Sequence, residues 1–314
     1  MHLPTELAEA IEAEASRHER SSLLRAVAAI SERYRGEGVR VTGRLSDAER
    51  AAYLAVRAPA IYGALREVLE ELAARIADAR VRTLLDLGAG PGTATWAASA
   101  VWPDLAGSTC LERDRGFIEL GRPLSPVAAT QWSEGDLRDD SKLPSADVVV
   151  LSYVVGEMEN PAALVERAWE AAEAALTIVE PGTPRGFAVI RAARDQLIRA
   201  GAEIAAPCPD SGECPMKGPD WCHFAARVER SRLHRQLKSG ELSYEDEKYS
   251  YVIASRLPAQ PVAARVVRHP WTEPGLVRLE LCTAGDVKSR TVRKTQKDQF
   301  RIARKARWGG DFPV

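Results

Sequence analysis

The chain reads Leu84-Leu85-Asp86-Leu87-Gly88-Ala89-Gly90-Pro91-Gly92 where a short apolar run meets three glycines at every second position. The apolar run predicts a buried parallel strand. The glycines that follow permit positive φ angles and let a ligand approach the backbone closely. A helix expected from Thr93 onward directs its free N–H groups at that ligand. The stretch therefore predicts a nucleotide-type pocket at the carboxyl end of a first strand.

The spacing of these glycines narrows the class of nucleotide. A dinucleotide loop requires G-x-G-x-x-G/A, and Thr93 stands at the third position here. No Gly-Lys-Ser/Thr follows, which argues against a P-loop. The stretch instead resembles motif I of the class I S-adenosylmethionine (SAM) methyltransferases, D-x-G-x-G-x-G.

This resemblance implies further cofactor-binding positions. In that family the loop passes under the methionine part of SAM, and an acidic residue ends the second strand. Glu112 ends the run 107–112, and its carboxylate can accept both ribose hydroxyls. An ordinary glycine-rich strand–helix turn is the alternative, but Glu112 in register favours a SAM site. The positions implied for SAM are Asp86, Gly88, Ala89, Gly90, Gly92 and Glu112, with Asp136, Leu137 and Ser152 from later strand ends.

Composition sets outer bounds on the class of protein. The 314 residues suffice for one large domain or two smaller ones with their own cores. The N-terminus lacks a basic segment followed by an apolar core, and no apolar run approaches membrane-spanning length. Five cysteines are too few for a secreted disulfide scaffold. We therefore expect a cytoplasmic protein that does not associate with membranes.

Periodicity predicts helices first and then an alternating segment. Residues 5–34 and 47–72 carry apolar side chains at helical spacing, and Ser46 with Glu49 forms an N-cap pair before the second stretch. These helices form either a cap over the pocket or a partner-binding arm. From Val81 strands and helices alternate, which predicts a parallel sheet with helices on both faces. Strands are expected at 83–87, 107–112, 128–132, 146–152 and 175–180, and a helix at 185–202.

In the methyltransferase fold the exit loop of the fourth strand holds the methyl acceptor. The sequence of this loop does not indicate which kind of atom would be methylated here. Ser152 to Gly156 is not the Asn/Asp-Pro-Pro-aromatic loop of exocyclic-amine methyltransferases. Methylation of cytosine C5 needs a cysteine nucleophile, whereas Cys110 lies inside a strand and is expected in the core. Glu157 is the candidate general base, although a glutamate in a helix-starting loop is usually solvated or capping.

Three of the five cysteines, Cys208, Cys214 and Cys222, fall within fifteen residues in a loop rich in Pro, Gly and Asp. A loop this poor in apolar residues is often ordered by a metal. The spacings C-x5-C and C-x7-C do not match zinc ribbons, while prolines directly after cysteines are typical of iron–sulfur proteins. His223 or Cys282 could complete the site. The residues leave zinc, an iron–sulfur cluster and unligated thiols open.

Further segments, in order, extend the resemblance to nearly all of the chain from Val81 to Gly310. They are Ala206-Pro207-Cys208-Pro209, Cys214-Pro215, Asp220-Trp221-Cys222-His223-Phe224, Tyr244-Glu245-Asp246-Glu247-Lys248-Tyr249-Ser250-Tyr251 and Ala303-Arg304-Lys305-Ala306-Arg307-Trp308-Gly309. With the SAM loop they resemble the mitochondrial small-ribosomal-subunit methyltransferase-like proteins and their bacterial relatives. The resemblance implies a [4Fe–4S] cluster on Cys208, Cys214, Cys222 and Cys282, with His223 as a neighbour. It also implies association with the small ribosomal subunit during maturation.

The C-terminal end is basic although the net charge of the chain is −1. Between residues 288 and 307 nine Lys/Arg stand against Asp298 alone, with Phe300 interleaved and Trp308 directly after. Cations neutralise phosphates and aromatic rings stack on bases, so this run and a helix expected after the cysteine loop are the predicted RNA surface. A solvated charged face is the alternative. The predicted RNA-binding residues are Arg227, Arg230, Arg235, Lys294, Arg301, Arg304, Lys305 and Arg307.

Together these features predict an α/β protein with a class I SAM-methyltransferase (Rossmann-like) sheet. We divide it into an N-terminal helical region 1–78, a SAM-binding core 79–203, a cysteine-rich cluster loop with a basic helix 204–240, and final strands with a basic extension 241–314. Its expected function is SAM-dependent action on the small ribosomal subunit or its rRNA, with a structural [4Fe–4S] cluster and zinc as the alternative occupant. A non-catalytic assembly factor that binds SAM and rRNA is the second hypothesis. We expect a monomer off the ribosome.

Overall fold

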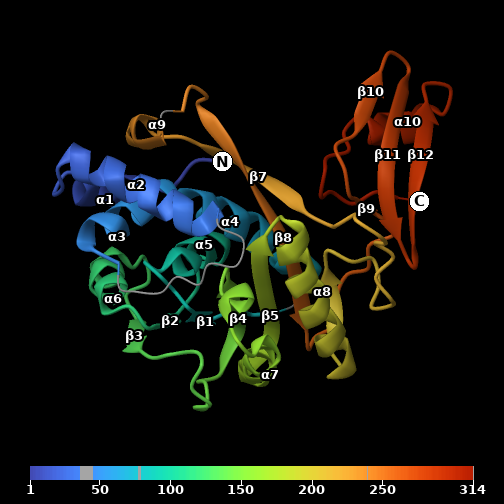
Figure 1. Cartoon of the computed structure of the whole chain (residues 1–314). Coiled ribbons are helices and arrows are strands. Elements are labelled where there is room, and N and C mark those ends of the chain that lie inside the picture. The colour runs from blue at the N-terminus through green and yellow to red at the C-terminus, as the bar shows by residue number, and fades with distance from the viewer. Residues whose placement is uncertain (36–44, 77–78, 239, 314) are drawn as a thin grey trace.

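The computed structural model describes residues 1–35, 45–76, 79–238 and 240–313 (Figure 1). Its helices are α1 Thr5–Ala15, α2 Arg20–Arg35, α3 Asp47–Val56, α4 Ala58–Arg75, α5 Thr93–Val101, α6 Arg115–Gly121, α7 Pro161–Ala171, α8 Pro184–Arg199, α9 Arg232–Lys238 and α10 Lys297–Ala303, with 3-10 turns η1 Arg122–Leu124 and η2 Val155–Glu157. Its strands are β1 Thr83–Leu87, β2 Gly107–Glu112, β3 Thr130–Glu134, β4 Ala146–Ser152, β5 Ala172–Pro181, β6 Glu203–Ala206, β7 Phe224–Glu229, β8 Tyr244–Ser255, β9 Arg265–Val266, β10 Trp271–Glu273, β11 Leu276–Thr283 and β12 Asp286–Arg293.

The larger sheet has the strand order β3-β2-β1-β4-β5-β8-β6, and β7 pairs with the first half of β8. Strands β1 to β5 run parallel, while β8 runs antiparallel to both β5 and β6. The predicted α/β, class I methyltransferase-like Rossmann sheet is confirmed. Its strand order reverses between β1 and β4, and in such sheets ligands bind outside the carboxyl ends at that point.

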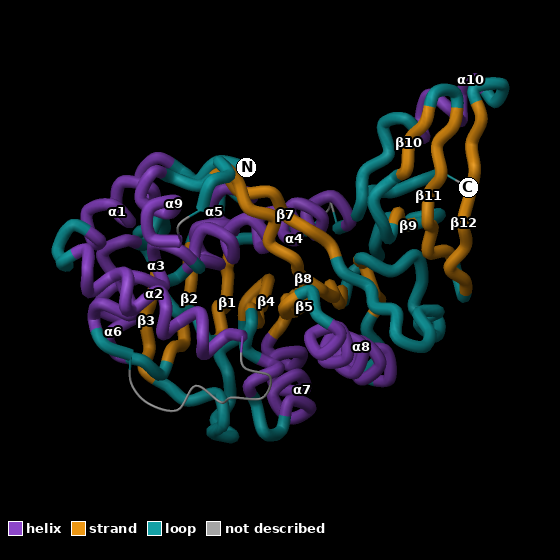
Figure 2. The backbone as a smooth tube through the Cα atoms, turned by 45° about the horizontal axis from the view of Figure 1, so that its top comes forward, coloured by secondary structure: helices purple, strands orange, loops and turns teal. Residues whose placement is uncertain are grey.

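Alternating side chains of the central strands supply two cores, one on each face of the sheet. Leu84 and Val148 pack with helices α3, α4 and α5 on one face. Leu85 and Val149 pack with α7 and α8 on the other face (Figure 2). Helices α1 and α2 join the first of these cores. The N-terminal helices therefore pack on one face of the larger sheet, and their expected role as a cap over the pocket or a partner-binding arm stays a prediction.

Several element boundaries differ from those predicted. The expected helix 5–34 is two helices, since α1 ends at Ala15 and α2 begins at Arg20, which lets both place apolar side chains in one core. The expected helix 47–72 is divided at Arg57, and Pro59 stands in the first turn of α4, where proline is tolerated. The predicted capping box of Ser46 with Glu49 is confirmed. The boundary expected at residue 78 lies outside the described residues.

The prediction of one helix that carries Arg227, Arg230 and Arg235 was wrong for residues 224–229. Residues Phe224–Glu229 form strand β7, in which buried and more exposed residues alternate, and the described helix α9 begins only at Arg232. Ladder pairing with β8 overrides the three- and four-residue spacing of the arginines.

A second, smaller sheet near the C-terminus combines β10, β11 and β12, with β9 beside β11. Figure 1 shows it projecting from one end of the larger sheet, with α10 lying against it. Its core contains Val277, Leu279 and Val292 from the strands, together with Ala303 and Phe312. The first part of the basic run expected as a tail, residues 288–293, therefore lies in strand β12, which pairs with β11 along eight residue pairs.

One buried arginine ties the second sheet to the first. Arg265 is 1% exposed, and its Nε donates to the Pro207 carbonyl oxygen at 2.9 Å. Its two terminal nitrogens donate to the Gly309 carbonyl oxygen at 2.7 Å and to Glu71 Oε1 at 2.7 Å. Asp311 adds an ion pair at 2.9 Å. A single side chain thus links α4, the cysteine loop and the last residues of the chain.

We expect Arg265→Met to lower the free energy of unfolding by about 3–5 kcal/mol, because it leaves buried carbonyls and the Glu71 carboxylate without their partner. Urea denaturation followed by circular dichroism measures the change. Arg293→Met is the matched control, since Arg293 is exposed and forms no ion pair with a described residue. Equal stability of the two variants would contradict the role given to Arg265.

Candidate functional site

The glycine loop lies where the sequence predicts it, between the end of β1 and the start of α5. Gly88, Gly90 and Gly92 all have positive φ, at 72°, 53° and 84°. The Gly88 N–H donates to the Leu111 carbonyl oxygen at 2.8 Å, which ties the loop to β2. A Cβ placed on Gly90 would meet no atom within 4 Å. The loop is therefore open in front of Gly90, and a ligand can approach its backbone there.

Glu112 stands beside this opening at the end of β2. Its Oε2 accepts from the Gly90 N–H at 2.8 Å, and its Oε1 accepts from the Asp114 N–H at 2.8 Å. The residue is 9% exposed, and burial raises the pKa of its carboxyl. A carboxylate has about four acceptor sites, so two backbone donors leave capacity for ligand hydroxyls.

Two buried polar atoms near the loop have no hydrogen-bond partner among the described residues. Asp86 Oδ2, on β1, and Ser152 Oγ, at the end of the neighbouring strand β4, are both in this state. Burial, followed by the nearby charge of Glu112, raises the pKa of Asp86 to about 7. Buried polar groups are normally satisfied, so an ordered water or a bound polar ligand would complete both atoms.

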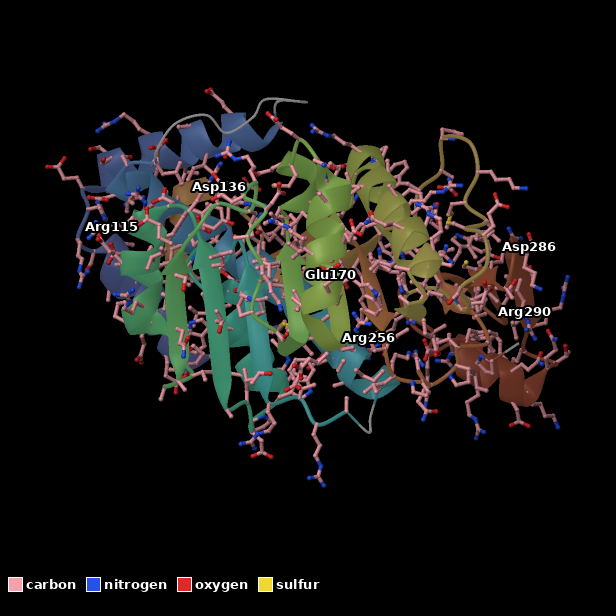
Figure 3. The ribbon with its side chains drawn as sticks, turned by 90° about the horizontal axis from the view of Figure 1, so that it is seen from below. Arg115, Asp136, Glu170, Arg256, Asp286 and Arg290 are labelled. Atoms are coloured by element: carbon pink, nitrogen blue, oxygen red, sulfur yellow. The ribbon has the colours of Figure 1, made fainter. Side chains whose placement is uncertain are left out.

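The remaining predicted pocket residues follow β3 and β4. Asp136 is held by Arg138, whose backbone N–H and Nε donate to it at 3.0 and 2.9 Å, and this pairing lowers the Asp136 pKa to about 2. Leu137 is buried, and its Cδ1 lies 3.6 Å from a Cβ placed on Gly88. Ala89 donates its N–H to the Leu111 carbonyl oxygen at 3.2 Å. Figure 3 shows Asp136 beside the larger sheet, at the far end of the molecule from Arg290.

The candidate general base Glu157 lies in η2 and is exposed. Its backbone N–H donates to the Val154 carbonyl oxygen at 3.0 Å, but its carboxylate makes no hydrogen bond or ion pair with any residue that the structure describes. No contact therefore orients its carboxylate for proton transfer. Cys110 is fully buried in β2, as expected for a core residue.

The exit loop of β4 carries a contact that the sequence did not indicate. Tyr153 has a φ of 58°, a strained value for a residue with a side chain, and its hydroxyl donates to Glu247 Oε1 at 3.0 Å. Arg57, between α3 and α4, also reaches Glu247 Oε1, at 3.4 Å. Closer to β2, Arg50 of α3 pairs with Asp114. Arg50 thus joins α3 to the turn after β2, while Glu247 of β8 joins Arg57, directly after α3, to the exit loop of β4.

The four cysteines predicted as ligands line one cavity of about 40 Å³, together with Arg194 and Arg265. Arg194 is buried on α8, and its Nε donates to Cys208 Sγ at 3.2 Å. Burial, followed by the nearby Cys208, Cys282 and Cys214 thiols, raises the pKa of Cys222 well above its usual range. Burial also raises the pKa of Cys282 to about 12. The fold therefore brings together thiols that stand up to 74 residues apart in the sequence.

Within the described ranges, no three His, Cys, Asp or Glu side chains stand close enough to hold a metal ion. His223 is 8% exposed and stacks on Trp221, with ring centroids 5.1 Å apart, while Trp308 contacts its edge at 4.9 Å. Its Nδ1 lies 3.3 Å from the Trp221 carbonyl oxygen.

The predicted RNA-binding residues separate into two groups. Arg227 pairs with Asp246 through two bonds of 2.7 and 2.8 Å, and Arg230 shares Glu245 with Lys238. Arg301 lies 3.4 Å from Asp298, one turn earlier in α10. The others are exposed and form no ion pair with a described residue, namely Arg235, Lys294, Arg304, Lys305 and Arg307.

Residues 47–313 match the family described as mitochondrial small ribosomal subunit Rsm22. The chain belongs to this family. It is 27% identical over 290 residues to the human ribosome assembly protein METTL17, mitochondrial, covering 83% of this chain and 62% of that one. It is 25% identical over 339 residues to the Rsm22-cox11 tandem protein 2, mitochondrial, of Schizosaccharomyces pombe, covering 87% of this chain and 44% of that one. The chain thus spans less than two thirds of the length of either relative.

Solved structures give weaker similarities. An O-methyltransferase family protein from Burkholderia thailandensis is 16% identical with a TM-score of 0.43, covering 68% of this chain and 60% of that one. Magnesium protoporphyrin IX methyltransferase from Synechocystis, with bound SAH, is 12% identical with a TM-score of 0.41, covering 74% of this chain and all of that one. The fold of this Rsm22-family chain is therefore assigned from its own strand order.

The expectation of a cytoplasmic protein is contradicted by these comparisons. The family and the human and yeast relatives are all named as mitochondrial. The expectation was based on the absence of secretory and membrane-spanning patterns, and this absence does not distinguish the cytoplasm from the mitochondrion. Among the described helices, none has the length and apolar character required to cross a membrane.

The raised pKa of Asp86 gives a prediction about stability against pH. An acid whose pKa is about 7 in the folded chain and about 3.9 when unfolded binds its proton more tightly in the folded state. Its contribution to the free energy of unfolding is fully present below pH 4 and is lost as the pH rises toward 7. We expect Asp86→Asn to remove this loss, so the variant gains up to about 4 kcal/mol relative to wild type across that range.

Chemical denaturation at several pH values between 4 and 8 measures this difference. Asp140→Asn serves as the control because Asp140 is an exposed carboxylate in the loop between β3 and β4. Parallel stability curves for wild type and Asp86→Asn would show that Asp86 ionises normally in the folded protein.

Proposed function

We propose that this Rsm22-family chain binds SAM and acts on the small ribosomal subunit or its rRNA. The observation that carries the proposal is that the glycine loop is open at Gly90 and that the Glu112 carboxylate lies beside this opening. The matching family is described as mitochondrial small ribosomal subunit Rsm22, which supports the ribosomal partner. The human relative is named a ribosome assembly protein, which supports the same partner. The monomeric state off the ribosome stays a prediction.

The residues around the loop suit the parts of SAM. Glu112 offers lone pairs to the ribose hydroxyls, while Asp86 Oδ2 and Ser152 Oγ are buried acceptors without a partner. Leu137 gives the adenine an apolar neighbour, and Asp136 remains the proposed acceptor for its amino group. Bound SAM would supply an activated methyl group; these side chains bind and orient it. Helix α5 begins at Thr93 directly after the loop, so its N-terminus can contribute N–H groups to the same site, apart from the Ala94 N–H, which bonds to Asp86.

Glu112→Gln should weaken SAM binding about 10- to 150-fold, because a hydrogen bond to a charged acceptor contributes roughly 1.5–3 kcal/mol. Isothermal titration calorimetry with SAM measures the affinity. Glu134→Gln is the control, since Glu134 ends the neighbouring strand β3 and is exposed. If both variants bind SAM like wild type, Glu112 does not hold the ribose.

A second candidate function is an assembly factor that binds SAM and rRNA without transferring the methyl group. Glu247 of β8 favours it, because this residue accepts from the Tyr153 hydroxyl and pairs with Arg57, and so holds the exit loop of β4, where an acceptor base would enter, against β8. Glu157, with no contact to orient it, favours it as well. Incubating the protein with labelled SAM and small-subunit particles from cells that lack it separates the two. Label in the rRNA supports an enzyme, whereas tight binding without label supports the assembly factor.

For the cysteine cavity we propose a [4Fe–4S] cluster held by Cys208, Cys214, Cys222 and Cys282, with zinc as the alternative occupant. Four thiols around one cavity are a soft donor set, and the Arg194 Nε that donates to Cys208 Sγ is the kind of N–H that stabilises thiolate ligands. The ligands must close around the group, since their present spacing does not form a metal site. When bound, the cluster would cross-link the loop at 208–222 to β11. Through Cys208, which accepts from Arg194 of α8, and Cys282 of β11, the bound cluster would hold the second sheet against α8.

The cluster is tested by the metal content of the protein. Wild type purified without oxygen is expected to be brown and to hold about four iron atoms per chain, and Cys208→Ser to lose most of this iron because a ligand is removed. Iron and zinc analysis with visible absorption spectra measures both. Cys110→Ala is the control, because Cys110 lies in the core of the larger sheet. A colourless wild type that holds no iron contradicts the cluster, and one equivalent of zinc supports the alternative.

A further inference from the structure

Strand β12 is an outer strand of the second sheet. It pairs with β11 on one side, and no other described strand pairs with it. Figures 1 and 2 both show β12 at the outer margin of this sheet. With eight residues it is longer than the other edge strands that the structure describes, namely β3, β6, β7 and β10.

The register of the β11–β12 ladder shows which backbone groups of β12 point outward. In an antiparallel pair, alternate residues exchange both hydrogen bonds with the partner strand, and the residues between them turn their N–H and C=O groups away from it. The Lys294 N–H donates to the Gly275 carbonyl oxygen at 2.8 Å, so the even-numbered residues of β12 face β11. Val287, Ser289 and Thr291 therefore direct their N–H and C=O groups outward.

These outward groups are free and accessible. Ser289 and Thr291 are exposed and Val287 is half-buried, and within the described ranges none of their outward backbone groups has a hydrogen-bond partner. The next outward donor, the Arg293 N–H, is already bonded to Gln296 Oε1 at 2.8 Å. The free edge is thus a short row in which N–H donors alternate with C=O acceptors.

This alternation is complementary to another extended strand. A strand presents donors and acceptors in the same order, so both kinds of group on β12 can be paired at once. An RNA backbone fits less well, because phosphates only accept hydrogen bonds and would leave the β12 carbonyls without partners.

The charge of β12 restricts the strand that can pair with it. Residues 286–293 contain Lys288, Arg290 and Arg293 against Asp286 alone. None of the three cations forms an ion pair with a described residue. Side chains directly opposite one another on paired strands lie about 4.5–5.5 Å apart, where opposite charges stabilise the pairing and like charges destabilise it. An acidic strand therefore fits this edge, whereas a second copy of β12 would set cations against cations.

We propose that the free edge of β12 binds an extended, acidic segment of a partner protein, which adds a strand to the second sheet. The backbone of this segment bonds to the outward groups of Val287, Ser289 and Thr291, and its carboxylates pair with the cations of β12. Cations on an edge strand also protect it from unwanted pairing, but this protection acts against basic or identical strands and not against acidic ones. The inference goes beyond the proposed function and does not depend on binding of SAM or rRNA.

Fluorescence anisotropy of the full chain with the labelled peptide Thr-Glu-Val-Glu-Val-Glu-Thr tests the proposal, with a twin peptide that carries Lys in place of Glu. We expect the lysine twin to bind at least about 10-fold more weakly, because attractive charge pairs become repulsive. The acidic peptide should also slow amide hydrogen exchange in residues 286–293, because it occupies their outward N–H groups.

Thr291→Pro should weaken binding of the acidic peptide about 10-fold or more, because proline removes an outward N–H but no bond to β11. Thr272→Pro is the matched control. Thr272 is exposed on the edge strand β10, and it stands opposite Val277, whose backbone groups face β12, so its own N–H also points outward. Circular dichroism checks that both proline variants fold.

Charge reversal tests the same contact without altering the backbone. Lys288→Glu should weaken binding of the acidic peptide and strengthen binding of the lysine twin, each about 2- to 30-fold, because one charge pair changes sign in each case. A loss of structure would weaken both peptides and could not produce this exchange of preference.

Several outcomes would overturn the inference. They are a wild type that binds neither peptide or both equally, an affinity of Thr291→Pro equal to that of wild type, and an unchanged preference in Lys288→Glu. A single-stranded RNA that displaces the acidic peptide and binds Thr291→Pro as well as wild type would show that the edge serves as an RNA-binding cation patch. A wild-type dimer that Thr291→Pro abolishes would show that a second copy occupies the edge. Specific peptide binding by a chain that binds neither SAM nor small-subunit particles leaves this inference standing while the proposed function fails.

Discussion

The buried guanidinium of Arg265 is the interaction on which the relation between the two sheets depends. A buried charge is tolerated only when its donors are all paired, and Arg265 finds its acceptors on three separate segments. Its bond to the Pro207 carbonyl oxygen fixes the start of the cysteine loop beside β9. Because β9 pairs with β11, the same arginine brings Cys208 and Cys282 to one cavity.

The pocket at the other end of the larger sheet differs from the Arg265 site, because some of its buried polar atoms have no partner among the described residues. Asp86 and Ser152 are buried with an unpaired oxygen each, and Tyr153 has a strained backbone. Such costs persist where the surrounding structure over-determines them, and they gather at functional sites. Here the surrounding structure is the apolar core on both faces of β1 and β4, together with the N-terminal helices held by Arg50 and Arg57.

The thiol cavity lies between helix α8 of the larger sheet and strand β11 of the second sheet. Helix α8 follows β5, packs on the larger sheet, and presents Arg194 to Cys208. Strand β11 carries Cys282 at one end and Arg278, opposite Trp271, nearer the other. A group bound by the four thiols would therefore join the larger sheet to the second sheet through α8 and β11.

The sequence by itself determined the parallel sheet and the position of the glycine loop. Strands 83–87, 107–112 and 146–152 were predicted with the boundaries that the structure has, because buried parallel strands are short apolar runs with clear ends. The sequence also singles out Cys208, Cys214 and Cys222 as candidate ligands, whereas only the family resemblance makes Cys282 the fourth, since residues 208 and 282 are far apart in the chain. Placement of the N-terminal helices, strand β7 and the second sheet was decided only by tertiary structure.

The reason is that these parts depend on partners distant in sequence. Arg227 and its neighbours have helical spacing, yet the hydrogen bonds offered by β8 make them a strand. Nothing local marks the contact of Tyr153 with Glu247, or the alternation that exposes Trp271 on a sheet closed by α10. Local pattern specifies which residues can be buried, and only long-range pairing specifies which partners they meet and which face stays open.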